Sequence, residues 1–124
     1  MSVDTLHRRL CHALFDALEE GDVAAVAACY APEMTMWFNV TTQETTRAES
    51  LDAIERGKSM HRRRNYNDRQ IHTFADGFVA QYTCEVVALN GAKVPLNACL
   101  VGEVHDGKIV RLMEYLDSGQ FRRQ

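Results

Sequence analysis

Apolar residues recur with helical spacing in the first half of the chain and with strand spacing in the second half. From Asp4 to Glu20 they fall three or four residues apart, which predicts an amphipathic helix with Asp4 as its N-cap and Gly21 as its end. A second helix is predicted from Asp22 through Tyr30, because Pro32 stops it. A third helix is predicted from Arg47 to about Arg63.

Residues that favour β-structure occupy most of the remaining chain. The earliest predicted strand runs from Met34 to Val40, and the polar stretch from Thr41 to Thr46 is predicted to be a loop. The hairpin signal Asp106-Gly107 joins the last two strands. The strands that follow the third helix are predicted near Asn65–Phe74, Phe78–Leu89, Lys93–His105 and Lys108–Leu116.

Helices followed by a run of antiparallel strands predict an α+β fold, and we expect residues 1–124 to form one domain. A long antiparallel sheet curls around its helices into a cone, with a pocket between sheet and helices where ligands usually bind. Apolar residues on both faces of the later strands, including Cys84, Val86 and Cys99, predict a homodimer through the outer face of the sheet.

Composition narrows the function classes. A net charge of -3 argues against a nucleic-acid binder, and no apolar run approaches the roughly 20 residues that span a membrane. No signal peptide is recognised, so we expect a cytoplasmic protein. No phosphate-binding glycine loop and no metal-ligand spacing of histidines or cysteines is found, so neither cofactor nor metal is expected. The four cysteines are interpreted as core residues: Cys11, Cys29, Cys84 and Cys99.

One carboxylate stands out in the predicted last strand. Glu114 shares a strand face with Leu112 and Leu116, and burial of an unpaired carboxylate is costly. An apolar environment raises the pKa of such an acid and suits it to general acid/base catalysis. The alternative is an ion pair with a cation from Arg47, Lys58 or the run Arg62-Arg63-Arg64, a run that would place positive charge at the end of the third helix.

Two segments carry a resemblance to a known family. Phe15-Asp16-Ala17-Leu18-Glu19-Glu20-Gly21-Asp22 and Asp106-Gly107-Lys108-Ile109, in this order of elements, resemble the SnoaL-like polyketide cyclases. These belong to the superfamily of nuclear transport factor 2, ketosteroid isomerase and limonene-epoxide hydrolase. The resemblance implies the cystatin-like cone of that superfamily, a fold that hosts many functions.

The resemblance also implies site residues. Glu114 stands where the cyclases place a catalytic acid, and Trp37-Phe38-Asn39 matches the Tyr-x-Asn of the hydrolases. Gln81 and Thr83 stand where the hydrolases carry Arg-x-Asp, so their epoxide hydrolysis is not expected here. The resulting prediction has Glu114 and Asn39 as catalytic residues, with substrate bound by Trp37, Gln81, His61, Leu112 and Leu116.

Two functions remain open from the sequence. The first is a cofactor-independent enzyme of the isomerase, cyclase or hydrolase type, in which Glu114 moves a proton on a hydrophobic small molecule. The second is a non-catalytic ligand-binding or dimeric interaction domain that uses the same pocket. An unpaired Glu114 in an apolar pocket favours the enzyme, whereas a tight salt bridge favours a structural role.

Overall fold

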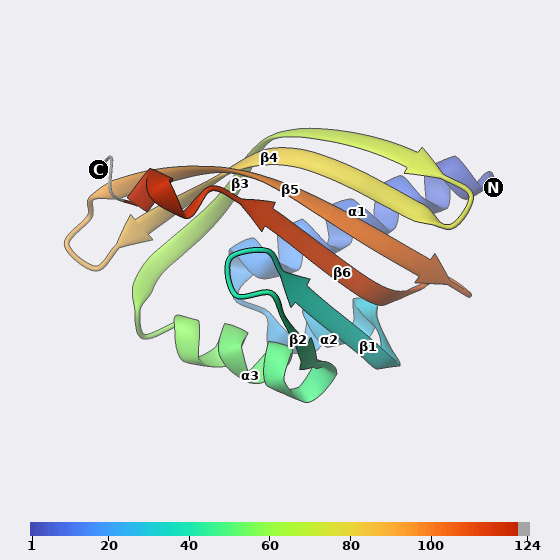
Figure 1. The fold of residues 1–124 in the computed structure, drawn as a ribbon, viewed down its shortest axis with the longest axis horizontal. Coiled ribbons are helices and arrows are strands. Elements are labelled where there is room, and N and C mark those ends of the chain that lie inside the picture. The colour runs from blue at the N-terminus through green and yellow to red at the C-terminus, as the bar shows by residue number, and fades with distance from the viewer. Residues whose placement is uncertain (122–124) are drawn as a thin grey trace.

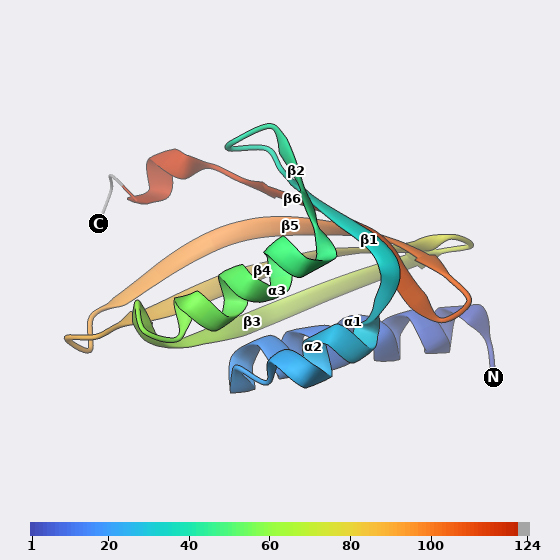
Figure 2. The ribbon, with the colours of Figure 1, turned by 90° about the horizontal axis from the view of Figure 1, so that it is seen from below.

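Three helices lie on the inner side of a bent six-stranded sheet in the computed structural model, which describes residues 1–121 (Figures 1 and 2). Helix α1 spans Val3–Glu20, α2 spans Val23–Cys29 and α3 spans Arg47–Gly57. The hydroxyl of Ser2, rather than Asp4, caps α1 by accepting from the Thr5 N–H. Helices α2 and α3 begin in the same way, at a side chain that accepts a hydrogen bond from one of the free N–H groups of the first turn.

The sheet contains β1 (Tyr30–Phe38), β2 (Gln43–Thr46), β3 (His61–Phe74), β4 (Gly77–Ala88), β5 (Lys93–His105) and β6 (Lys108–Leu116). Their order across the sheet is β2-β1-β6-β5-β4-β3. Neighbouring strands are antiparallel except β1 and β6, which pair in parallel. The predicted α+β fold with helices on a strongly curved sheet is thus confirmed, and the sheet is mixed rather than wholly antiparallel.

Several predicted boundaries are wrong. Strand β1 begins at Tyr30 rather than Met34 and ends at Phe38 rather than Val40. The predicted loop from Thr41 to Thr46 contains β2, which pairs with β1 at the edge of the sheet. The third helix ends at Gly57 rather than near Arg63, and β3 begins at His61. The run Arg62–Arg64 therefore belongs to an edge strand instead of a helix C-terminus. Pairing of β3 with β4 satisfies the backbone there, which overrides the helix-compatible local sequence.

Alternation along the strands separates an inner from an outer face. In β4, Phe78, Ala80, Tyr82 and Cys84 are buried on the inner face. Phe15 of α1 packs there, with its ring centroid 5.0 Å from Tyr66 and 4.8 Å from Tyr82. The hydrophobic core therefore lies between α1, α2 and the inner face of the sheet.

Cys11, Cys29 and Cys84 match the prediction of core residues, whereas Cys99 is half-buried on the outer face of the sheet, so its prediction is wrong. All four are free thiols, and three of them are buried. Burial raises the pKa of Cys11 to about 12 and that of Cys84 to about 11. These thiols stay protonated at neutral pH, which makes them poor nucleophiles.

No helix within residues 1–121 is long and apolar enough to cross a membrane.

Candidate functional site

The inner face of the sheet encloses a cavity of about 540 Å³ together with α1 and α3. Its walls are mostly aliphatic and aromatic, as in small-molecule binding sites. Leu112 and Leu116, both predicted to bind substrate, lie in these walls. The charged residues that line this interior cavity are Glu49, Arg56, Arg64 and Glu114.

Glu114 has no ion-pair partner within 4.0 Å in the described part of the chain, so the predicted alternative of a salt bridge is not what the structure shows. Its one side-chain hydrogen bond among those residues comes from Tyr82, whose hydroxyl donates to Glu114 Oε2 over 3.1 Å. Burial raises the pKa of Glu114 above its ordinary value, although Tyr82 and the charge of Arg64 oppose this. The predicted rise of this pKa is confirmed.

The second carboxylate that lines the cavity, Glu49, differs from Glu114 in its hydrogen bonding and in the direction of its pKa shift. Its side chain accepts the backbone N–H of Thr46 and completes the capping box of α3. This hydrogen bond lowers the pKa of Glu49. Glu49 is therefore ionised and engaged in holding a helix, whereas Glu114 is the carboxyl group suited to proton transfer.

Three tyrosine hydroxyl groups share the cavity with Glu114: those of Tyr30, Tyr66 and Tyr82. Burial raises the pKa of all three phenols, that of Tyr30 to about 12. They keep their protons at neutral pH. The Tyr82 hydroxyl donates its hydrogen bond to Glu114, whereas Tyr30 and Tyr66 can donate hydrogen bonds to an oxygen of a ligand. The sequence prediction missed Tyr82, although its alternation with Phe78 and Ala80 indicates the inner face.

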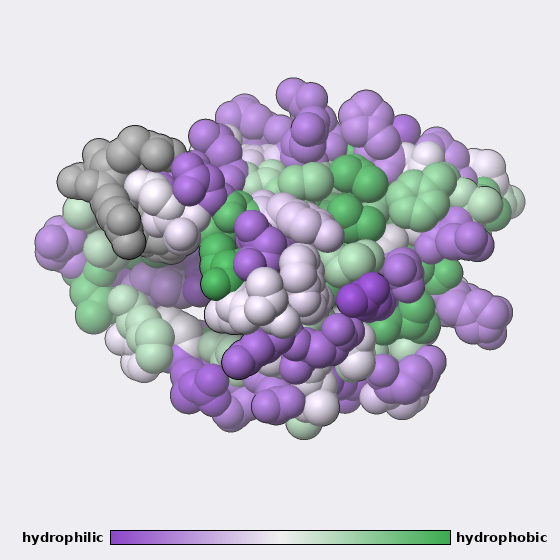
Figure 3. Space-filling view, in the orientation of Figure 1, coloured by the Kyte–Doolittle hydropathy of each residue, from purple (hydrophilic) through white to green (hydrophobic). Residues whose placement is uncertain are grey.

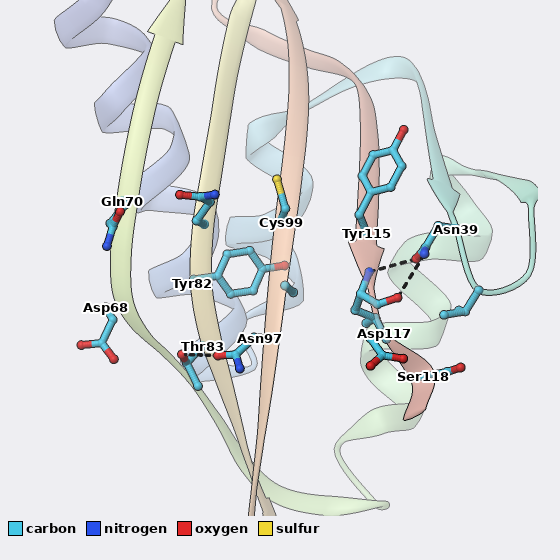
Figure 4. Close-up of a pocket in the computed structure, with 14 residues that line it drawn as sticks. Asn39, Asp68, Gln70, Tyr82, Thr83, Asn97, Cys99, Tyr115, Asp117 and Ser118 are labelled. Atoms are coloured by element: carbon cyan, nitrogen blue, oxygen red, sulfur yellow. Dashed lines mark hydrogen bonds between the residues drawn. The ribbon is translucent and has the colours of Figure 1, made fainter. Parts of the chain in front are cut away.

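Gln81 lies on the outer face, so its predicted inward orientation is wrong. It is exposed and contributes to a shallow outer groove together with Gln70, Cys99 and Tyr115, three residues that Figure 4 labels. The register aligns Gln81 with Cys99 and Cys99 with Tyr115, which places all three on the same side of the sheet. Because side chains alternate along a strand, the neighbour Tyr82 faces the cavity instead.

Trp37 and Asn39 also point away from the interior cavity, contrary to the prediction. The Trp37 ring contacts Tyr115 on the outer face, with 5.4 Å between ring centroids. Asn39 lines the outer groove, and its side chain holds the backbone of Leu116 (Figure 4). Asn39 Nδ2 donates to the Leu116 carbonyl over 3.0 Å, and the Leu116 N–H donates to Asn39 Oδ1 over 2.9 Å.

The backbone of Asn39 is anchored to the same strand, because its N–H donates to the Glu114 carbonyl over 3.0 Å. Asn39 thus fixes the end of β6, the strand that carries Glu114, without reaching the cavity. Its geometry is that of a positioning residue and not of a catalytic one.

His61 is not among the residues that line the cavity within the described chain. Its ring lies against the end of α3, where Nε2 would be 3.5 Å from a Cβ added at Gly57. Burial lowers the pKa of His61, and the charge of Arg64 lowers it further. The prediction that His61 binds substrate therefore has no support from its position.

No group of three or more potential metal ligands is found among residues 1–121.

The comparisons with known proteins agree with this fold. A family model described as a SnoaL-like domain matches residues 11–112. A candidate polyketide cyclase of Xanthomonas campestris has a TM-score of 0.88 at 21% identity, covering 99% of this chain and 98% of its own. A candidate polyketide cyclase of Pseudomonas putida has a TM-score of 0.82 at 23% identity, covering 93% and 94%.

A third solved structure is that of a Catenulispora acidiphila protein with a ketosteroid isomerase-like fold, in complex with trimethylamine. It has a TM-score of 0.80 at 11% identity, covering 90% of this chain and 87% of its own. At such identities these likenesses establish the fold alone. No curated protein sequence matches this chain significantly.

Proposed function

The chain belongs to the SnoaL-like domain family, and we propose that it is a cofactor-independent acid/base catalyst that acts on a hydrophobic small molecule. The observation that carries this proposal is Glu114, a carboxyl group without an ion pair among the described residues and with a raised pKa in an apolar cavity. A raised pKa brings a carboxyl group closer to neutral pH, where general acid/base catalysis is most efficient.

The chemistry follows from what surrounds Glu114. The ionised carboxylate removes a proton from a carbon next to a ligand carbonyl, and the electron pair of the C–H bond moves onto the carbonyl oxygen. In a ligand with a carbon–carbon double bond conjugated to the enolate, return of the proton from Glu114 to the far end of that system shifts the double bond and completes an isomerisation. In a ligand with a second carbonyl, attack of the enolate carbon on that carbonyl closes a ring, and Glu114 gives its proton to the alkoxide that forms. The protonated phenols of Tyr30 and Tyr66 can donate hydrogen bonds to the oxygen that gains charge.

Deuterium exchange tests this proposal without knowledge of the natural substrate. The probe is 2-tetralone, a bicyclic ketone with acidic hydrogens next to its carbonyl, whose exchange in D₂O is followed by proton NMR. We expect the protein to accelerate exchange and Glu114→Gln to remove about 100-fold or more of that acceleration, the usual contribution of a general base.

Glu103→Gln is the matched control, because it makes the same chemical change at an exposed position of β5. It should exchange 2-tetralone at the wild-type rate. A Glu114→Gln variant that is folded and equally active would refute the proposed catalytic role.

A second candidate function is ligand binding without turnover. The observation that favours it is that the cavity walls within residues 1–121 contain no histidine or aspartate to share the proton transfer with Glu114. For this function, 2-tetralone would bind with no acceleration of exchange in the wild-type protein.

We also propose that a second copy of the chain covers the outer face of the sheet. Two residues that motivated the predicted homodimer, Cys84 and Val86, lie inside the cavity, so they cannot contribute. A row of half-buried apolar residues does cross this face: Val79, Val101, Met113 and Trp37. Figure 3 shows hydrophobic (green) side chains among hydrophilic ones on the side of the molecule that it views. Sedimentation at micromolar concentration should show a dimer, and a monomer alone would contradict this.

A further inference from the structure

Arg64 and Arg56 are the cations that line the interior cavity within residues 1–121. Arg64 shares the inner face of β3 with Tyr66, since the two are separated by one residue, and both line the cavity. Part of Arg64 is exposed to solvent. Burial nevertheless has the largest single effect on the pKa of its guanidinium, and this effect lowers the pKa. The exposure and the effect of burial together indicate a guanidinium that protein atoms surround and that solvent still reaches.

Arg64 has no carboxylate partner within 4.0 Å in the described chain. Its interactions are with the Tyr66 hydroxyl and, through charge, with Cys84 and Glu114, which together leave the Arg64 pKa above its ordinary value. Several other arginines are neutralised by acids, in the pairs Arg8–Asp4, Arg56–Asp52, Arg69–Asp16 and Arg111–Glu44.

We propose that Arg64 binds a carboxylate of the ligand, so that the substrate class is a hydrophobic ring compound that carries one acidic group. This inference rests on the proposed function, because it concerns the same cavity. A guanidinium presents two parallel N–H donors that match the two oxygens of a carboxylate. The aliphatic and aromatic walls then enclose the hydrophobic body.

The two charged groups also fix the orientation of such a ligand. Arg64 lies on β3 and Glu114 on β6, with β4 and β5 between the two strands. A ligand carboxylate is attracted to the guanidinium and repelled by ionised Glu114. The acidic end therefore stays at the solvent-accessible mouth, and the hydrophobic body extends toward Glu114 and Tyr82.

A pair of isosteric probes tests this inference. The probes are 2-naphthoate, which is anionic at pH 7.5, and 2-naphthamide, which has the same ring system and no charge. Binding is measured by isothermal titration calorimetry. We expect wild-type protein to bind 2-naphthoate about tenfold or more tightly than the amide, as a desolvated charge-assisted pair requires. Arg64→Gln should remove this preference by weakening only the naphthoate.

Arg63→Gln is the matched control. It removes the same charge from the adjacent residue, whose side chain hydrogen bonds Asn65 on the opposite face of β3. Its affinity for both probes should equal that of the wild type. Arg64→Lys keeps the charge without the paired donors and should bind naphthoate with intermediate affinity.

The outcomes separate this inference from the proposed function. Equal affinity of the two probes for wild-type protein, or no effect of either Arg64 variant, overturns the assignment of Arg64. Acceleration of 2-tetralone exchange would still support the catalytic proposal in that case. Failure of both probes to bind overturns the assignment, and it also counts against a ligand-binding cavity.

Discussion

Replacing Tyr82 by phenylalanine should destabilise the protein more at high pH than at low pH. The substitution removes the hydroxyl group that donates to Glu114 Oε2 over 3.1 Å. The aromatic ring, which packs 4.8 Å from Phe15 and 5.5 Å from Tyr66 between centroids, is retained. The change therefore isolates one hydrogen bond at the site.

The magnitude depends on the charge of Glu114. A hydrogen bond to a charged group contributes about 1.5–3 kcal/mol to the free energy of unfolding, and one between neutral groups about 0.5–1.5 kcal/mol. The loss in Tyr82→Phe should therefore grow by about 1 kcal/mol as the pH rises through the folded-state pKa of Glu114. The hydrogen bond lowers this pKa in the wild type, so the variant should show a still higher Glu114 pKa.

Urea unfolding from pH 4.5 to pH 8.5 measures this difference. The control is Tyr66→Phe, because the Tyr66 hydroxyl interacts with Arg64, whose charge does not change in this range. Its loss of stability should be independent of pH. In a Glu114→Gln background, Tyr82→Phe should also lose its pH dependence. A constant difference between wild type and Tyr82→Phe over the whole range would refute the reasoning.

Three further substitutions test separate parts of the structure. Folding raises the pKa of Glu114, so the contribution of this group to stability is present below its unfolded-state pKa and is lost as the pH rises through its folded-state pKa. At pH 7 the Glu114→Gln variant should therefore be as stable as the wild type or more stable, as measured by urea unfolding. Gly102→Ala would place a Cβ 2.4 Å from the buried Phe78 ring, and we expect a loss of about 1–3 kcal/mol in the same assay. Asn39→Ala should cost about 1–3 kcal/mol, since it removes two hydrogen bonds to Leu116, while 2-tetralone exchange persists in the folded variant.

The sequence predicts those parts of the fold where local signals and tertiary contacts agree. Strand β6 begins and ends as predicted, because Asp106 and Gly107 adopt positive φ angles of 49° and 75° in a tight turn. The first residues of β3 resemble a helix in sequence, because Arg62, Arg63 and Arg64 are exposed and His61 packs against the end of α3. Such positions show no apolar alternation.

Within the site, strand alternation is more informative than the family resemblance. Met34, Met36 and Phe38 are apolar with period two, and Met34 is buried while the other two line the cavity. This pattern places Trp37 and Asn39 on the outer face. The resemblance assigned them to the pocket because it relied on motif spacing in another protein. The hydrogen bond between Tyr82 and Glu114 joins β4 to β6 across the intervening β5, and the sequence alone could not reveal this strand order.

The central claim is that Glu114 moves a proton on a molecule bound in the interior cavity. The most direct test compares the pH dependence of 2-tetralone exchange with the titration of the Glu114 carboxyl carbon, assigned by ¹³C NMR against Glu114→Gln. We expect the exchange rate and the carboxyl signal to share one midpoint, above the ordinary glutamate value of 4.5. A carboxyl midpoint at or below 4.5, or an exchange rate that follows a different midpoint, would contradict it.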